Sequence, residues 1–126
     1  MADSDRTLNI VGESLRNPDG GQRQAEIKRC LAGEPVELQL RHGNPQAAKA
    51  VAVISCRGIQ IGSLKAEHAR WIGERMDRGS PMPAIIERIS GGTPDRPSLG
   101  VSIRLNVDGI PPTPTRRGWL DRMLGR

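Results

Sequence analysis

Four side chains in this sequence could bind a transition metal through sulfur or imidazole nitrogen: Cys30, His42, Cys56 and His68. They follow one another at intervals of 12, 14 and 12 residues. Structural zinc sites usually take their ligands in close pairs separated by about two to four residues, and no such pair exists here. We therefore expect no metal site, and two cysteines are too few for a disulfide framework. The simpler interpretation is two buried, reduced thiols and two surface histidines.

Two further kinds of catalytic motif are also missing. Ser14 follows Gly12 and Glu13, but Arg16 stands where a G-x-S-x-G nucleophile elbow needs its second glycine. Gly91-Gly92 lacks the lysine and the following helix of a phosphate-binding loop. We therefore expect a protein that is not an enzyme and that carries no cofactor.

Positive charge is the remaining chemical signal. The chain has 19 Lys and Arg against 14 Asp and Glu, a net charge of +5. Sixteen of these cations are arginine, whose guanidinium can form two parallel hydrogen bonds with one phosphate. Residues 110–126 carry a net charge of +3, which leaves +2 for residues 1–109. A basic tail on a nearly neutral body attracts anions of any kind, so charge alone does not identify the partner.

The composition also bears on where the protein resides. No stretch of about 18 apolar residues occurs, so we expect no membrane span. The first five residues are acidic and are not followed by the apolar segment of a secretory signal. These observations predict a cytoplasmic protein.

The periodicity of apolar residues predicts the elements that must position any site. Val36, Leu38 and Leu40 alternate with polar residues, as in a half-buried strand. The continuous apolar run at 50–55 is typical of a strand buried on both faces. The full pattern predicts strands at 8–11, 36–41, 50–55, 59–63, 84–89 and 101–107, and helices at 22–31 and 65–78. This β-α-β-β-β-α-β-β order, with mostly short links, favours a mainly β protein with two helices, folded as a small OB-like barrel.

The chain also divides by composition. We expect residues 1–7 to be flexible, residues 8–109 to form the barrel domain, and residues 110–126 to form a Pro-rich linker and a basic amphipathic tail. Four apolar side chains of this tail are spaced as one face of a short helix: Trp119, Leu120, Met123 and Leu124. They predict a docking peptide for a protein partner, with packing against the barrel and a frayed end as the alternatives.

Several short segments follow one another along the chain in a distinctive order: Val11-Gly12-Glu13-Ser14, residues 31–36, Asn44-Pro45, residues 50–53, residues 58–64, Glu67, Ala69, Gly79 and residues 89–92. Taken in this order, they resemble the HIRAN domain. HIRAN domains occur at the N-terminus of some SWI2/SNF2 DNA-dependent ATPases and also as stand-alone prokaryotic proteins. The resemblance covers about a hundred residues and implies an OB-like barrel with two helices.

The resemblance also implies a function and a set of site residues. In eukaryotic members it implies binding of the 3′-hydroxyl end of single-stranded DNA. Carried over by position, the binding pocket falls on Ser14, Leu15, Arg16, Asn44, Ala47, Ser63, Lys65 and Ala66. The sequence departs from the family pattern at four positions, where Leu15 stands for an aromatic residue, Ala47 for Asp, Lys49 for Asn, and Ser63 for Tyr or His.

These observations lead to one hypothesis and one alternative. The hypothesis is a nucleic-acid-binding module for single-stranded DNA, including its 3′ ends. Phosphate and sugar contacts are predicted at Arg16, Arg41, Asn44, Lys49 and Lys65, and a hydroxyl contact at Ser63. The alternative is a protein-interaction adaptor that docks a partner through the C-terminal tail. The oligomeric state and a preference for DNA over RNA stay open.

Overall fold

The computed structural model describes residues 4–41 and 50–113. Within this part of the chain the elements are β1 (Asp5–Val11), α1 (Arg23–Ile27), β2 (Pro35–Arg41), β3 (Ala50–Ile54), β4 (Gln60–Leu64), α2 (Ala66–Asp77), β5 (Ala84–Ser90) and β6 (Gly100–Asn106). The order β-α-β-β-β-α-β-β confirms the prediction. No helix in the described ranges is both long enough and apolar enough to cross a membrane.

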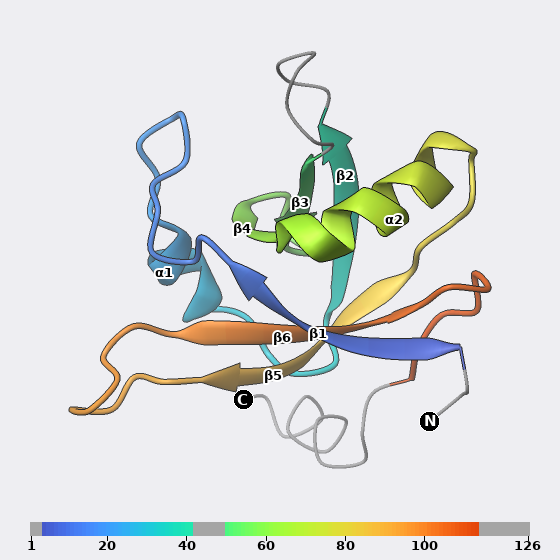
Figure 1. Cartoon of the computed structure of the whole chain (residues 1–126). Helices are drawn as coiled ribbons and strands as arrows, with labels where there is room; N and C mark the ends of the chain where they lie inside the picture. Colours follow the sequence, from blue (N-terminus) through green and yellow to red (C-terminus); the bar gives the residue numbers. More distant parts are fainter. Residues whose placement is uncertain (1–3, 42–49, 114–126) are drawn as a thin grey trace.

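The six strands form a closed antiparallel barrel in the order β1-β4-β3-β2-β5-β6, which confirms the predicted small OB-like barrel (Figure 1). Two strands pass from one side of the barrel to the other. Residues 5–9 of β1 pair with β6, whereas Ile10 and Val11 pair with β4. Pro35 and Val36 of β2 pair with β5, and residues 37–41 pair with β3. This sharing closes the barrel with no strand left at an edge.

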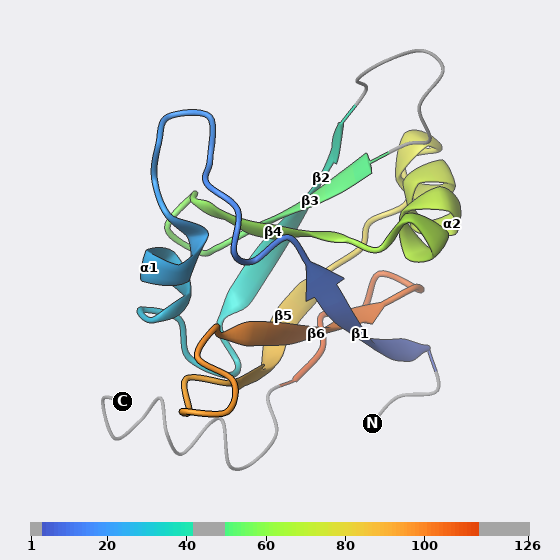
Figure 2. The ribbon, with the colours of Figure 1, turned by 60° about the vertical axis from the view of Figure 1, so that its left-hand side comes forward.

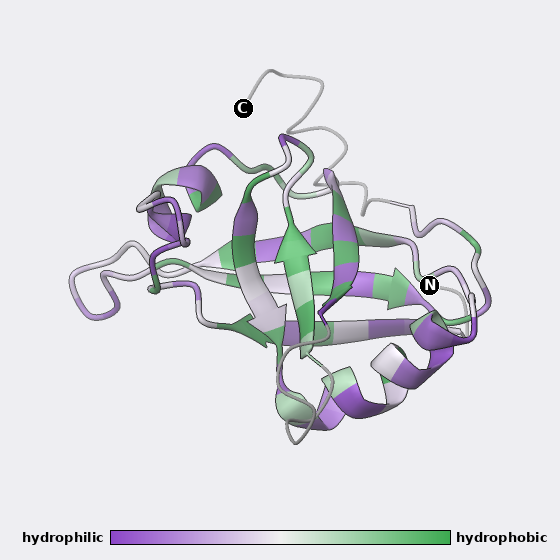
Figure 3. Cartoon of the chain, turned by 90° about the horizontal axis from the view of Figure 1, so that it is seen from above, coloured by the Kyte–Doolittle hydropathy of each residue, from purple (hydrophilic) through white to green (hydrophobic). Residues whose placement is uncertain are grey.

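The barrel interior is aliphatic. Its fully buried side chains include Val51, Val53, Ile61, Ile86, Ile103 and Leu105. Figure 3 shows apolar and polar bands alternating along several strands, as expected where one face of a strand is buried. Strand β3 is the exception, because residues 51–54 are all buried and α2 packs against this strand. The prediction of burial on both faces is therefore confirmed for residues 51–55, whereas Ala50 at the start of the run is exposed.

The two helices lie on opposite sides of the barrel, as the two views in Figures 1 and 2 both show. Helix α1 places Ile27 in the core, and Cys30 follows it there. Helix α2 adds Ala69 and Ile72 to the same core. Apolar residues on one helical face thus extend the barrel interior at both places.

Two predicted boundaries are wrong by three or more residues, whereas the others agree within one residue. Strand β1 begins at Asp5, three residues before the predicted start, because residues 5–7 pair with residues 104–106 of β6. Helix α1 ends at Ile27 instead of residue 31. The backbone N–H groups of Arg29 and Cys30 bond to carbonyls three residues earlier, at 2.9 and 3.0 Å. Such i to i+3 bonds tighten the chain and end the α-helix early.

The described start of the C-terminal segment contacts the barrel. Pro112 is buried, and the carbonyl of Thr113 accepts a hydrogen bond from the guanidinium of Arg104. Arg104 lies on β6 and is buried beside Glu87, with Nε 3.0 Å from a carboxylate oxygen. The side chains of the tail beyond residue 113 lie outside the described residues.

Candidate functional site

An open cleft of about 390 Å³ lies between the end of β1, the hairpin that joins β5 to β6, and the start of α2. Three parts of the sequence separated by more than twenty residues each meet there. The polar residues that line the cleft are Asn9, Glu13, Ser14, Lys65, Arg88, Ser90, Arg96, Ser98 and Ser102.

The hairpin loop at 91–99 forms one wall of the cleft and is tightly folded. Gly91 has a φ of +87°, and a Cβ atom at this position would lie 2.1 Å from the carbonyl oxygen of Ser98. Only glycine fits this close approach. Thr93 and Arg96 bond to each other through backbone N–H and carbonyl groups, at 3.1 Å in each direction. Arg96, which lines the cleft, therefore starts from a fixed backbone position.

The segment that follows β1 is fixed by the first side chain of α1. Arg23 is buried and donates through Nη1 to the carbonyl of Gly12 at 2.9 Å, and through Nε to Oδ1 of Asn17 at 2.8 Å. Asn17 in turn donates to the carbonyl of Gln60 on β4 at 3.0 Å. These bonds hold Ser14 at the cleft without using its own side chain.

Gln24 joins the two walls of the cleft. Its amide nitrogen donates to the carbonyls of Glu13 and Leu99, at 3.1 and 2.9 Å. Its amide oxygen accepts from the backbone N–H of Leu99 at 2.7 Å. Ser14 and Ser98, one on each wall, lie 3.5 Å apart through their hydroxyl oxygens. A single side chain of α1 therefore sets the spacing of the two walls, and its bonds to Leu99 span 75 residues of the chain.

The charges of the cleft are unequal. Lys65, Arg88 and Arg96 line it, and none of the three has a carboxylate partner among the described residues. The opposing charge is Glu13, whose Oε2 accepts a hydrogen bond from the backbone N–H of Val101 at 3.1 Å. Three cations and one carboxylate leave an excess of two positive charges. An open cleft with this excess attracts anions and gives them hydrogen-bond donors.

The structure brings two of the predicted site residues into this cleft, Ser14 and Lys65. Leu15 is next to Ser14 in the chain and is 60% exposed, but it does not line the cleft. Arg16 donates to the carbonyl of Gly20 within its own loop, at 3.1 Å.

The other predicted contacts lie elsewhere. Arg41 is at the end of β2 and donates to Gln39 at 3.1 Å. Ser63 is on β4, paired with Val11, and its hydroxyl accepts from Gln60 at 3.4 Å. Asn44 and Lys49 lie outside the described residues, as do Trp119, Leu120, Met123 and Leu124 of the tail. The predicted protein docking through this tail therefore stays a prediction.

Sequence reasoning missed two cations of the cleft, Arg88 and Arg96. The sequence does hold a signal for them, because Arg96 lies within a Gly- and Pro-rich hairpin loop and Arg88 lies on the strand just before it. Their approach to Ser14 and Lys65 could not be read from that signal. It depends on closure of the barrel between β1 and β6.

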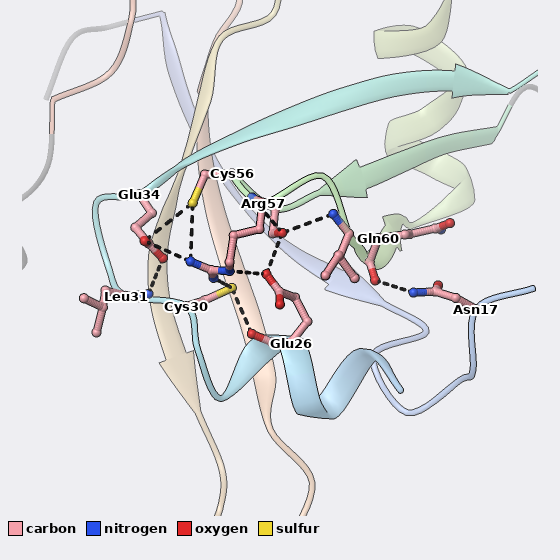
Figure 4. A network of polar contacts seen from close by, with 10 residues as sticks. Asn17, Glu26, Cys30, Leu31, Glu34, Cys56, Arg57 and Gln60 are labelled. Atoms are coloured by element: carbon pink, nitrogen blue, oxygen red, sulfur yellow. Dashed lines mark hydrogen bonds and ion pairs between the residues drawn. The ribbon is translucent and has the colours of Figure 1, made fainter. Parts of the chain in front are cut away.

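A second polar cluster lies on the other side of α1, and Figure 4 shows it from close by. Arg57, in the turn between β3 and β4, contacts Oε2 of Glu26 at 2.6 Å and a carboxylate oxygen of Glu34 at 3.5 Å. The hydroxyl of Ser55 donates to the same Oε2 atom at 2.7 Å. Burial lowers the pKa of the Arg57 guanidinium, but the bond to Glu26 and its charge outweigh that effect and raise the pKa above its usual value. Arg57 is therefore fixed in its charged state.

Both thiols of the chain contact this guanidinium. Arg57 donates to the sulfur of Cys30 at 3.3 Å and to that of Cys56 at 3.6 Å. Burial raises the pKa of Cys30 to about 11, against the lowering effect of Arg57. Cys30 is buried as expected, whereas Cys56 is exposed, so the interpretation of two buried thiols is wrong for the second. Among the described residues, no group of three or more His, Cys, Asp and Glu is placed to hold a metal ion.

Comparison with known proteins agrees with this architecture. The family model of the HIRAN domain matches residues 9–108. The chain belongs to the HIRAN domain family. HIRAN domains are nucleic-acid-binding modules, so the family and the charge of the cleft indicate the same class of ligand. The resemblance predicted from the sequence is confirmed.

A crystal structure of a protein from Lactobacillus plantarum shares the fold. It is 19% identical, with a TM-score of 0.57 over 81% of this chain and 98% of that one. At this identity the likeness concerns the fold alone. No curated protein matches the chain.

Proposed function

We propose that this HIRAN domain binds single-stranded DNA, with an end of the strand in the cleft between β1, α2 and the β5–β6 hairpin. The observation that carries the proposal is the group of three cations around one cleft, Lys65, Arg88 and Arg96, which have no carboxylate partner in residues 4–41 and 50–113. Phosphate contacts supply most of the affinity of proteins for nucleic acids, and Lys and Arg are the residues that make them.

The size of the cleft favours a single strand. Its volume of about 390 Å³ is near the lower end of small-ligand pockets, which hold roughly 300–1,000 Å³. This volume is of the order of one nucleotide, which supports a single strand as the ligand. Ser14 and Lys65, two of the positions that the HIRAN resemblance places in the pocket for a 3′ end, line this cleft. A strand end is therefore the part of the DNA that we place there.

The test is fluorescence anisotropy of a labelled 12-nucleotide strand titrated with protein at several salt concentrations. If the three cations each neutralise one phosphate, log Kd should rise with log salt with a slope of about 2. The triple variant Lys65→Gln, Arg88→Gln, Arg96→Gln should weaken binding by at least about tenfold at low salt and flatten the slope. The matched control is Arg29→Gln, since Arg29 is exposed and does not line the cleft.

Two competitors test the form of the nucleic acid. Unlabelled linear single strand should displace the label, whereas circular single strand and blunt duplex should be much weaker competitors. The proposed activity is binding without cleavage, so the labelled strand should be recovered intact. Equal competition by the circle would exclude recognition of an end. A triple variant that binds like the Arg29→Gln control would exclude this cleft.

A further inference from the structure

The cleft holds groups that suit one chemical form of a strand end better than another. It combines the hydroxyls of Ser14 and Ser98 with three cations, Lys65, Arg88 and Arg96, that pair with no carboxylate in the part of the chain that the structure describes. All these groups can donate hydrogen bonds, and the cations donate only. The one carboxylate among the described lining residues, on Glu13, already accepts from Val101 N–H through Oε2. Donors and positive charge therefore exceed acceptors.

We infer that the cleft prefers a strand end that carries a phosphomonoester over one that ends in a hydroxyl. This inference rests on the proposed function and states which terminus that site takes. A terminal phosphate carries a charge of about −1.5 to −2 at neutral pH and three strong acceptor oxygens. Two arginines, a lysine and two hydroxyls match that charge and that number of acceptors. An internal phosphodiester carries a single negative charge and has two free oxygens.

A hydroxyl end would need the opposite kind of partner. Its best acceptor is a carboxylate, and among the described residues that line the cleft only Glu13 provides one. In a phosphate site, by contrast, Glu13 opposes the ligand through its negative charge. The two kinds of terminus therefore predict opposite effects for removal of the Glu13 charge.

The experiment compares four strands of the same sequence by anisotropy: both ends hydroxyl, a 3′-phosphate, a 5′-phosphate, and a hydroxyl-ended strand two nucleotides longer. The longer strand matches the total charge of the phosphorylated ones. We expect at least one phosphorylated strand to bind about fivefold or more tightly than the longer hydroxyl strand, since charge-assisted contacts are about twice as strong as neutral ones. The two phosphorylated strands show which terminus enters the cleft.

Variants assign the preference to the cleft. Arg88→Gln and Arg96→Gln should each reduce the preference for the phosphorylated strand, and Arg29→Gln should leave it unchanged. Glu13→Gln keeps an oxygen that can accept from Val101 N–H and removes the charge. It should strengthen binding of the phosphorylated strand by about two- to fivefold, as expected for one like charge removed from a partly exposed site.

The outcomes separate the two claims. Equal affinity for phosphorylated and charge-matched hydroxyl strands, or loss of hydroxyl-strand binding in Glu13→Gln, would overturn the inference and leave the proposed function standing. Absence of binding by all four strands at low salt would overturn the proposed function itself. A phosphate preference that persists in Arg88→Gln and Arg96→Gln would place the phosphate outside this cleft and would also overturn the inference.

Discussion

Arg57 and Arg96 both lie in loops that join neighbouring antiparallel strands, but their surroundings differ completely. Arg57 lies within 2.6 Å of the Glu26 carboxylate and also contacts Glu34 and both thiols. Arg96 lines an open cleft with Lys65 and Arg88, and no carboxylate among the described residues pairs with it. The first arginine has its charge neutralised within the protein. The second leaves its charge available to an anion from solution.

This difference shows why arginine content alone says little about function. The same side chain stabilises the fold where buried carboxylates face it and forms a candidate ligand site where they do not. Burial decides which case applies, because the Glu26 side chain is only 2% exposed and an unpaired charge there would be costly. Substitutions in the Arg57 cluster should therefore affect stability, and substitutions in the cleft should affect binding. Helix α1 contributes residues to both regions.

The largest effect is expected from Arg57→Met, which leaves the buried Glu26 without its cation. Removal of one partner of a buried ion pair typically costs about 3–5 kcal/mol of stability. Because Arg57 is partly exposed, we expect the low end of this range, a loss of about 3 kcal/mol. The midpoint of urea denaturation, followed by circular dichroism, should fall accordingly. The double variant Glu26→Gln, Arg57→Met should recover part of the loss. Single-strand affinity of the protein that remains folded should be unchanged, and a parallel loss of affinity would contradict the separation of the two regions.

A second prediction concerns pH and the same cluster. Burial raises the pKa of Cys30 in the folded protein to about 11, from an ordinary pKa of 9.0. Above pH 9 the unfolded chain therefore binds fewer protons than the folded one. The contribution of the Cys30 thiol to the free energy of unfolding is fully present below pH 9. It is lost as pH rises towards 11, by at most about 1.4 kcal/mol per pH unit.

Urea denaturation of the protein and of Cys30→Ala at pH 8 and pH 10 measures this contribution. Other groups also titrate in this range, so the informative quantity is the difference between the two proteins. The variant should lose less stability between the two pH values. Equal losses would show that the Cys30 thiol is not the group responsible.

A sequence pattern predicts structure well only where the pattern acts over a short distance along the chain. Alternation of apolar residues is a local signal, so the strands, the helices and their order could be predicted. The early end of α1 could not, because residues 28–30 close shorter turns that periodicity does not distinguish from helix.

The cleft depends on longer-range contacts. Glu13 meets Val101 and Gln24 meets Leu99 across 88 and 75 residues, after β1 has paired with β6. Ser14 and Lys65 were predicted because the family resemblance assigns pocket positions directly, without the long-range contacts having to be derived. Arg88 and Arg96 were missed because neither residue belongs to that resemblance. The pairing of Arg57 with Glu26, 31 residues apart, was likewise absent from any local pattern.

A third prediction tests the residue of α1 that links the walls of the cleft. Gln24→Ala removes three hydrogen bonds to the backbones of Glu13 and Leu99. These groups are part-buried, so the stability loss should be about 1–2 kcal/mol. Single-strand affinity should also fall several-fold, because Ser14 and Arg96 lose their fixed spacing.

The control is Gln22→Ala, since the side chain of Gln22 is exposed and makes no capping bond to α1. Isothermal titration and urea denaturation together give both quantities for each variant. Arg57→Met should affect stability alone, whereas Gln24→Ala should affect both. Unchanged affinity in Gln24→Ala would show that the cleft does not need this link.

The smallest effect, a gain in affinity, is expected at Leu15. This side chain is 60% exposed beside Ser14, so a larger ring can replace it with little cost to the fold. Stacking of a base on an aromatic ring contributes about 1–3 kcal/mol, and a Tyr at the rim should give the low end of that range. Leu15→Tyr should therefore bind single strands about fivefold more tightly, whereas Val11→Tyr, at another exposed apolar position, provides a control for added surface. A gain in Leu15→Tyr that is absent in Val11→Tyr would show that the strand leaves the cleft past residue 15. No gain would show that the bases pass on the side of Arg88 and Arg96, with the phosphates still at the three cations.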